Sequence, residues 1–211
     1  MVERAQRLSV PDLVERSRSL ARGRGRVIIG IAGAPGAGKS TLAQALVSSL
    51  GAETVWVPMD GFHLADHVLT ALGRRDRKGA PDTFDAAGYV ALLGRLRDRG
   101  LHVVYAPAFH RDREEPIAGS IPVPPETQIV VTDGNYLLLT DPPWSQIAGL
   151  LDEAWFLRPA EEVRQTRLIA RHIAYGKSPV AARDWALGTD QRNAELVTAS
   201  ADRADLVLAF D

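Results

Sequence analysis

The sequence predicts an α/β domain with a mainly parallel sheet and helices on both faces. One observation is a set of short apolar runs rich in β-branched residues, and the other is that helical patterns separate most of these runs. A continuous apolar run is typical of a strand that is buried on both faces. Strands that alternate with helices form βαβ units with right-handed crossovers, and such units build a parallel sheet between two helical layers.

The expected elements follow one another in a regular order. A helix begins at Ser9, which precedes Pro11 and Asp12, and it ends near Leu20. The expected strands span residues 27–31, 54–57, 102–105, 128–132, 153–157 and 205–209, and the expected helices span residues 41–50, 86–99, 143–151, 160–175 and 179 to about 201. The proline-rich connection over residues 107–125 stands out, because connections of this length are usually functional or disordered.

The composition limits the partners and the compartment. The 211 residues include 25 basic and 26 acidic side chains, and a formal net charge of −1 argues against nucleic-acid binding. The absence of cysteine excludes disulfides and thiolate metal sites. No apolar run is long enough to span a membrane, and the first residues do not form a secretory signal. We therefore expect one cytoplasmic domain over residues 1–211 that binds no membrane, with a homodimer left open.

A phosphate-binding loop is predicted directly after the first strand. The segment GAPGAGKS fits the pattern GxxxxGK[ST] and opens the next helix, as the phosphate-binding mechanism requires. Its glycines let backbone N–H groups converge on phosphate oxygens, while Lys39 would reach the β- and γ-phosphates and Ser40 would bind Mg²⁺. The residues expected to bind ATP are Gly33, Ala34, Pro35, Gly36, Ala37, Gly38, Lys39, Ser40 and Thr41. The fold class is therefore a P-loop NTPase three-layer sandwich; the alternative, a glycine-rich turn without a ligand, fits the flanking strand and helix poorly.

Two carboxylates follow strands of the predicted sheet. Asp60 comes after the strand at 54–57, and Asp133 comes after the strand at 128–132. Because ligands bind beyond the carboxyl ends of the strands in an open parallel sheet, both side chains should face the phosphate loop. Phosphoryl transfer to an alcohol needs one carboxylate near the attacking hydroxyl and another near Mg²⁺, and Asp60 and Asp133 fit these roles. The alternative is that each Asp-Gly pair merely begins a turn.

These motifs resemble the branch of P-loop kinases that holds bacterial pantothenate kinase, uridine kinase and phosphoribulokinase. Met59–Phe62 is similar to the pantothenate kinase segment whose Asp is the catalytic base, and RKGAPDTFD at residues 77–85 resembles that family's RKGxPxSYD stretch. The segment DGNY at 133–136 corresponds to the family's E-G-(L/N), with Asp133 in place of the usual Glu. The region after Pro107 looks most like a subgroup described as nucleoside/nucleotide kinase-like or fructokinase-like. The resemblance implies a kinase that uses ATP and Mg²⁺.

The resemblance also implies a helical lid, over residues 167–179, that closes over ATP. The helix expected at 160–175 carries Arg164, Arg167 and Arg171 on one face, because they are three and four residues apart. Guanidinium groups fork onto phosphate oxygens and stay charged, so we expect Arg167 and Arg171 to contact the phosphates. The alternative is a solvated basic face.

The acceptor is expected to bind near Asp60 and the basic cluster RRDRK at 74–78, which either attracts an anionic substrate or is a solvated loop. The expected substrate-binding residues are Asp60, Phe62, His63, Arg77, Lys78 and Tyr136.

The sequence thus predicts transfer of the γ-phosphoryl group of ATP to a hydroxyl group of a small metabolite that is pantothenate-, nucleoside- or sugar-like. The expected catalytic residues are Lys39, Asp60, Arg167 and Arg171. ATP is expected rather than GTP, because no guanine-reading NKxD or TKxD motif follows the loop. One rival hypothesis is a regulatory ATPase without a metabolite acceptor. Another is a nucleic-acid 5′-end kinase, which the neutral overall charge disfavours.

Overall fold

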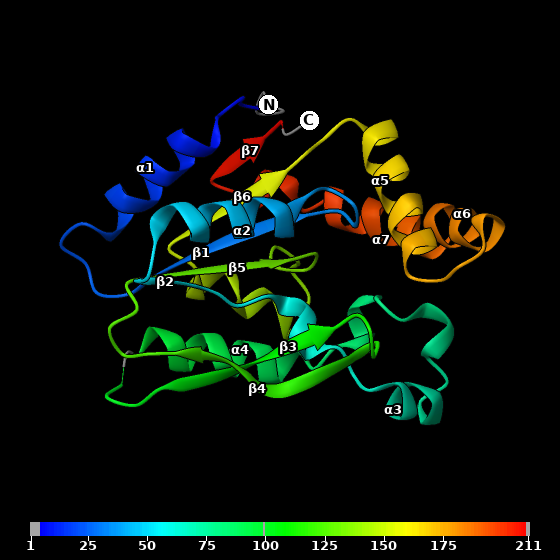
Figure 1. The fold of residues 1–211 in the computed structure, drawn as a ribbon, viewed down its shortest axis with the longest axis horizontal. Coiled ribbons are helices and arrows are strands. Elements are labelled where there is room, and N and C mark those ends of the chain that lie inside the picture. Colours follow the sequence, from blue (N-terminus) through cyan, green and yellow to red (C-terminus); the bar gives the residue numbers. More distant parts are fainter. Residues whose placement is uncertain (1–4, 99, 210–211) are drawn as a thin grey trace.

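A five-stranded parallel sheet forms the centre of the protein in the computed structural model, which describes residues 5–98 and 100–209 (Figure 1). The strands lie in the order β2-β5-β1-β6-β7. Their bounds are β1 (Val27–Gly33), β2 (Thr54–Trp56), β5 (Ile129–Gly134), β6 (Glu153–Leu157) and β7 (Leu206–Leu208). All residues of β1, β5 and β6 are buried, as expected for continuous apolar runs between two helical layers.

Helices cover both faces of the sheet, which confirms the predicted α/β class. On one face, Ile29 and Ile31 of β1 belong to a core cluster shared with α1 (Val10–Ala21) and α2 (Lys39–Leu50). On the other face, Ile28 belongs to a cluster shared with α4 (Ala86–Arg97) and α7 (Thr189–Thr198). Successive residues of a strand point to opposite faces, so one apolar run supplies both cores.

The first helix forms where the sequence predicts it. Ser9 is the N-cap of α1: its hydroxyl accepts from the backbone N–H of Asp12, and the Asp12 carboxylate accepts from the backbone N–H of Ser9. This reciprocal pairing satisfies two of the amide donors that a helix start leaves open.

The predictions of a strand at 102–105 and of a long connection at 107–125 were wrong in detail. They form an antiparallel hairpin, β3 (Val104–His110) and β4 (Glu115–Val123), which is a separate two-stranded sheet. Figure 1 shows this hairpin beside α4, away from the parallel sheet. The prolines of this segment argued against a strand assignment, because proline lacks an N–H donor and is tolerated only at strand edges and bulges. A two-stranded ribbon offers both kinds of position.

Two predicted helices also differ from the structure. Instead of one helix at 143–151 there are two short 3₁₀ turns, Trp144–Gln146 and Ala148–Leu150. Trp144 and Ile147 are both buried, and a spacing of three residues suits the 3₁₀ repeat. The helical segment expected from 179 to about 201 is divided at Gly188 into α6 (Pro179–Leu187) and α7. Helix α4 ends at Arg97, and residue 99, the predicted end, lies outside the described residues.

The remaining elements lie at the end of the molecule where the parallel strands finish. They are α3 (Asp66–Ala71), α5 (Glu161–Ala174) and the 3₁₀ turns Met59–Phe62, Arg75–Arg77 and Pro81–Thr83. In Figure 1, α5 and α6 stand opposite α3 at this end. A further 3₁₀ turn, Ala201–Arg203, precedes β7 at the other end of the sheet. No helix within residues 5–98 and 100–209 is long and apolar enough to cross a membrane.

Candidate active site

The predicted phosphate loop connects β1 to α2. Gly36 and Gly38 have φ values of 84° and 93°, in the left-handed region that favours glycine. Gly38 is the N-cap of α2, and no side chain accepts a hydrogen bond from the first amides of the helix. Because these amides point along the helix axis and carry a partial positive charge, they are free to bind an anion.

Lys39, the first residue of α2, is buried with only 9% of its surface exposed. Its ammonium group donates to the carbonyl oxygen of Ala34 at 3.1 Å and to Oδ1 of Asn135 at 2.8 Å. Burial lowers the pKa of Lys39 to about 8, although the nearby charges of Asp133 and Asp60 oppose this change. Lys39 is thus a desolvated cation whose hydrogen-bonding partners are neutral.

Ser40 and Asp133 meet beside this lysine. The Ser40 hydroxyl donates to Oδ2 of Asp133 at 2.8 Å, and the indole N–H of Trp56 donates to Oδ1 at 2.7 Å. Burial and the nearby charge of Asp60 raise the pKa of Asp133, against the effects of Lys39 and of these hydrogen bonds. A hydroxyl and a carboxylate are hard oxygen donors of the kind that Mg²⁺ prefers, so this pair fits a magnesium ion brought in with a nucleotide.

Asp60 lies on the 3₁₀ turn after β2, and 34% of its side chain is exposed. Nη2 of Arg111 lies 3.2 Å from its Oδ2. Burial acts to raise the pKa of Asp60, but the neighbouring His63 and Arg111, with Lys39 and Arg171 beyond them, bring it below its ordinary value. The carboxylate is therefore ionised near neutral pH, as a proton acceptor must be.

One cavity of about 400 Å³ joins these groups. Pro35, Lys39, Ser40, Asp60 and Asp133 all line it. The two carboxylates predicted from separate strand ends therefore face the same space as the phosphate loop. A cavity with both a phosphate loop and an ionised carboxylate could hold a phosphoryl donor and a hydroxyl acceptor together.

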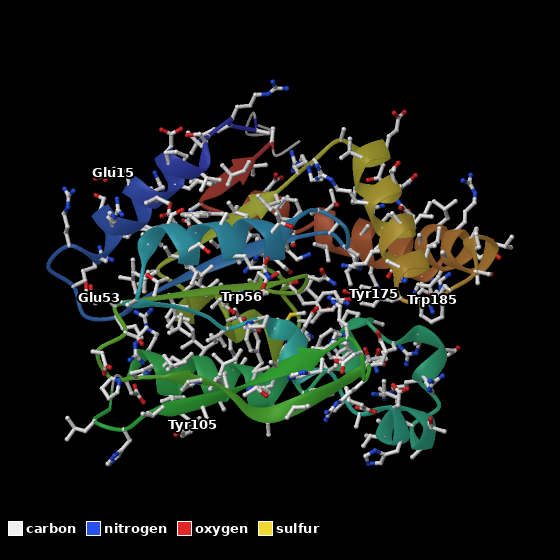
Figure 2. All side chains as sticks on the ribbon, viewed as in Figure 1. Glu15, Glu53, Trp56, Tyr105, Tyr175 and Trp185 are labelled. Carbon is white, nitrogen blue, oxygen red and sulfur yellow. The ribbon has the colours of Figure 1, made fainter. Side chains whose placement is uncertain are left out.

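Arg111 is held by three parts of the fold at this cavity. Besides its contact with Asp60, its guanidinium carbon lies 5.8 Å from the ring centre of Phe109 and 5.7 Å from that of Tyr175. Phe109 belongs to the hairpin, and Tyr175 follows the last residue of α5. Figure 2 shows Tyr175 at the same end of the molecule as Trp185. Arg111 thus connects the hairpin, the proposed base and the predicted lid.

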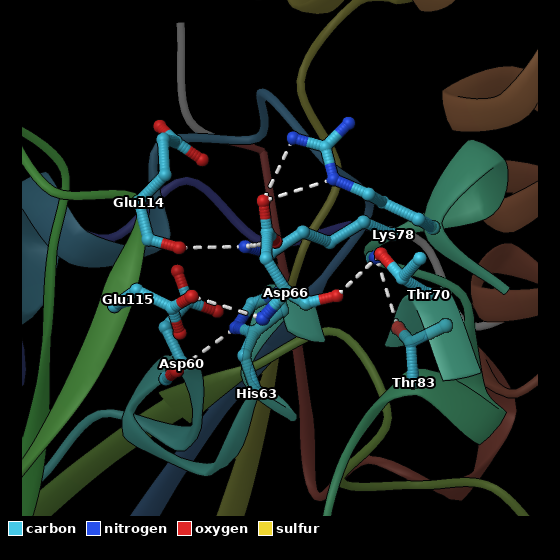
Figure 3. A network of polar contacts seen from close by, with 10 residues as sticks. Asp60, His63, Asp66, Thr70, Lys78, Thr83, Glu114 and Glu115 are labelled. Atoms are coloured by element: carbon cyan, nitrogen blue, oxygen red, sulfur yellow. Dashed lines mark hydrogen bonds and ion pairs between the residues drawn. The ribbon is translucent and has the colours of Figure 1, made fainter. Parts of the chain in front are cut away.

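A network of ion pairs forms the wall farther from the phosphate loop (Figure 3). The Asp66 carboxylate binds the Lys78 ammonium at 2.5 Å and Arg75 at 2.8 Å. Lys78 also donates to the carbonyl oxygen of Glu114 at 2.6 Å, and Glu115 accepts from the backbone N–H of Asp66 at 2.9 Å. These contacts join α3 to the tip of the hairpin.

The three arginines of the predicted lid helix have different surroundings. Arg164 is buried, and it donates to the carbonyl oxygen of Pro35 at 2.9 Å and pairs with Glu161. Arg167 is exposed and does not line the cavity, but its Nη1 lies 3.8 Å from the position that a Cβ on Gly38 would take. Arg171 lines the cavity. The single basic face expected from the spacing is thus divided among loop support, the outer surface and the cavity.

Some predicted substrate-binding residues lie in the cavity and others lie outside it. His63 and Lys78 line it. Phe62 instead packs on Tyr89 at 5.1 Å, and Tyr136 is fully buried with its hydroxyl donating to the carbonyl oxygen of Gly79. Arg77 forms an ion pair with Asp82 at 2.5 Å, away from the cavity wall. Thr41, expected to bind ATP, is exposed on α2 and also lies outside the lining.

Sequence reasoning did not select several residues of the cavity wall. Asn135 accepts from Lys39 and directly follows the predicted Asp133-Gly134 pair, so its place at a strand end was a usable signal. Arg111 lies in the turn of a hairpin that was not predicted. Nε2 of His172 in α5 lies 2.7 Å from Oδ2 of Asp190 in α7, and no local sequence pattern predicts a contact between residues so far apart in the chain.

Comparison with known proteins identifies related sequences. A model of the Phosphoribulokinase / Uridine kinase family matches residues 28–209. "Putative uridine kinase C227.14" of Schizosaccharomyces pombe is 37% identical over 180 residues, which are 80% of this chain and 75% of that protein. "Uncharacterized protein YggC" of Escherichia coli is 32% identical over 190 residues, which are 87% of this chain and 77% of that protein.

Solved structures show the same fold. A "putative fructose transport system kinase" from Silicibacter sp. TM1040 is 36% identical with a TM-score of 0.84, and the match covers 95% of this chain and 98% of that one. YFH7 from Saccharomyces cerevisiae, described as "a putative P-loop containing kinase with a circular permutation", also has a TM-score of 0.84 at 17% identity, and the match covers 96% of this chain and 99% of that one. The second likeness concerns the fold alone.

Proposed function

We propose that this chain, which belongs to the Phosphoribulokinase / Uridine kinase family, transfers the γ-phosphoryl group of ATP to a hydroxyl group of a small metabolite. The observation that carries this proposal is the shared cavity: the phosphate loop, the Ser40–Asp133 pair and the ionised Asp60 all face it. A nucleotide switch would need the first two features but has no use for a base placed to receive a hydroxyl proton.

The binding of ATP is assigned to the loop and to two cations. The free amides at the start of α2, the Lys39 ammonium and Arg171 would hold the phosphates, and Ser40 with Asp133 would hold Mg²⁺. Magnesium, when bound with ATP, neutralises charge on the phosphate oxygens. On this assignment, Lys39 exchanges its neutral partners for phosphate oxygens, which are better partners for a buried cation.

Asp60 is the proposed general base. The acceptor hydroxyl donates its proton to the Asp60 carboxylate while its oxygen forms a bond to the γ-phosphorus. The bond between that phosphorus and the oxygen bridging to the β-phosphate breaks, and ADP leaves with the electron pair. Arg111 keeps Asp60 ionised before the reaction, because its positive charge favours the carboxylate.

The substitution Asp60→Asn tests this role. It keeps the shape of the side chain and removes its proton affinity, so acceptor phosphorylation should fall roughly 100- to 10,000-fold. The dissociation constant of ATP should change little, because the loop, Lys39 and Ser40 remain. The assay is a screen of hydroxylated metabolites for ADP formation by the wild type, followed by kcat for the best acceptor in both proteins. Near wild-type turnover by the variant would remove Asp60 from the mechanism, and ATP hydrolysis that no acceptor stimulates would favour the regulatory ATPase.

The names of the relatives do not agree on one acceptor. One is named for uridine, and another is named for fructose transport. The acceptor must therefore be inferred from the cavity of this chain.

A further inference from the structure

The positive charges of the cavity are distributed unevenly. Beside the phosphate loop, neither Lys39 nor Arg171 makes an ion pair with a carboxylate of the described chain. At the other end, the cations beside Asp60 already have a carboxylate: Arg111 has Asp60, and Lys78 shares Asp66 with a further arginine. Lys177, elsewhere on the wall, lies 4.5 Å from the ring centre of Trp185 and makes no ion pair within the described chain. Spare positive charge is thus found beside the phosphate loop and at Lys177, and an anionic acceptor bound beside Asp60 would have to break an existing ion pair.

His63 has one nitrogen directed to the backbone and one that is open. Its ring lies between Phe84 and Phe109, with ring-centre distances of 4.0 and 4.8 Å. Nδ1 lies 2.8 Å from the carbonyl oxygen of Asp60 (Figure 3), and since a carbonyl oxygen only accepts, Nδ1 carries the hydrogen. Burial, aided by the charges of Lys78 and Arg111, lowers the pKa of His63 against the opposing effect of Asp60, so the ring is neutral near neutral pH.

The second nitrogen, Nε2, is consequently a hydrogen-bond acceptor. It has no hydrogen-bonding partner among residues 5–98 and 100–209, and it is not one of the atoms sealed from solvent. Because His63 lines the cavity, this lone pair is open to a ligand there. The Asp60 carboxylate supplies a second acceptor nearby, while Arg111 uses only Nη2 on Asp60 and keeps other N–H donors.

These groups define what a matching ligand must carry. When a ligand covers these two acceptors, it must supply a donor to each, because an acceptor sealed from water without a donor is costly. One donor is the hydroxyl that reacts. A second hydroxyl group close to it can supply the other, and the donors of Arg111 then suit the oxygen of either group. The ring of Phe109 adds an apolar wall against which carbon atoms can pack.

We infer that the acceptor is an uncharged polyol, bound through one hydroxyl to Asp60, through a neighbouring hydroxyl to Nε2 of His63, and through an oxygen to Arg111. This inference rests on the proposed kinase function and specifies its substrate class. Free sugars, sugar alcohols and the ribose of a nucleoside all present such hydroxyl pairs. Hydroxy acids and sugar phosphates are disfavoured, because Arg111 and Lys78, the cations beside Asp60, are already paired.

The first experiment measures acceptor preference with the wild-type protein. ADP formation is followed with four groups of compounds: neutral sugars and sugar alcohols, nucleosides, hydroxy acids, and sugar phosphates. We expect the highest kcat/KM within the first two groups, and the comparison of these two distinguishes a free sugar from a nucleoside. Removing the neighbouring hydroxyl from the best acceptor, by use of its deoxy analogue, should lower kcat/KM roughly 10- to 100-fold.

The second experiment uses two substitutions that each imitate one nitrogen of His63. His63→Asn retains a donor near Nδ1 and removes the acceptor at Nε2, while His63→Gln places an amide oxygen near the Nε2 position. We expect His63→Asn to raise the acceptor KM and to lower kcat/KM roughly 10- to 100-fold, with the ATP dissociation constant unchanged. His63→Gln should recover most of the loss. His67→Asn, on the exposed face of α3, is the matched control, and melting temperatures check folding.

The outcomes separate this inference from the function on which it rests. Lys39-dependent phosphorylation of a hydroxy acid or sugar phosphate in preference to every neutral polyol would overturn the inference and leave the kinase intact. Equal kcat/KM in folded His63→Asn and wild type, or full activity with the deoxy analogue, would also overturn it. ATP hydrolysis that no compound stimulates would overturn the proposed kinase function and the inference together.

Discussion

The buried ammonium of Lys39 should make the stability of the nucleotide-free protein depend on pH. Its pKa is about 8 in the folded protein and 10.5 in an exposed lysine. Between these values the unfolded chain binds more protons than the folded one, so the free energy of unfolding rises with pH. Integration from pH 7 to pH 9 gives a gain of about 1 to 2 kcal/mol. For a protein of this size the gain corresponds to roughly 2 to 8 °C in Tm.

The substitution Lys39→Met removes this gain and keeps much of the side-chain volume. The measurement is thermal unfolding of wild type and variant, without nucleotide, at intervals from pH 7 to pH 9. Other titrating groups contribute equally to both proteins, so the difference in Tm should move in favour of the wild type as pH rises. Lys177→Met controls for the loss of a lysine elsewhere in the cavity wall. A difference that stays constant across this range would refute the argument that burial lowers the pKa of Lys39.

Three further predictions follow from the lid helix and the loop. Arg171→Ala should lower kcat more than it weakens ATP binding, because a cation without an ion pair interacts most strongly with phosphate in the closed, water-poor state. A larger decrease of kcat in Arg167→Ala than in Arg171→Ala would reverse the roles that we assign. Arg164→Met should destabilise the fold by roughly 1 to 3 kcal/mol in denaturant unfolding, since it leaves the loop carbonyl of Pro35 without its donor, and unchanged stability would count against it. Thermal-shift titrations with Mg²⁺ should show stronger stabilisation by ATP than by GTP, and the opposite order would contradict the choice of donor.

The parts of the fold that were predicted depend on local sequence. The run at 27–31 is apolar without interruption, and the loop at 33–40 has fixed spacing, so strand, loop and helix could each be assigned from neighbouring residues. The hairpin could not be assigned in this way. Its pairing joins residues such as Val104 and Val123, and its prolines contradict the usual strand pattern. Arg111 was consequently not selected, although it lies on the proposed base.

Adjacent residues show why the site was only partly predicted. The motif DGNY identifies the right position, but Asn135 faces Lys39 while Tyr136 is buried in the core. Likewise, His63 lines the cavity and Phe62 packs beside it on α4. In extended or turning backbone, neighbouring side chains point in different directions, so a motif locates a site to within one residue. The choice between neighbours depends on packing partners that are distant in sequence.

The contact between α5 and the phosphate loop restricts how the lid can move. A Cβ on Gly36 would lie 2.7 Å from the carbonyl oxygen of Arg164 and 3.1 Å from Cβ of Leu168, so the first half of α5 is pressed onto the loop. Arg164 adds a hydrogen bond to the same loop at 2.9 Å. Closure over a nucleotide by rotation of the whole helix would separate these surfaces. If the predicted lid closes over a nucleotide, we therefore expect α5 to bend beyond Leu168, so that only the short segment with Arg171 and Tyr175 moves.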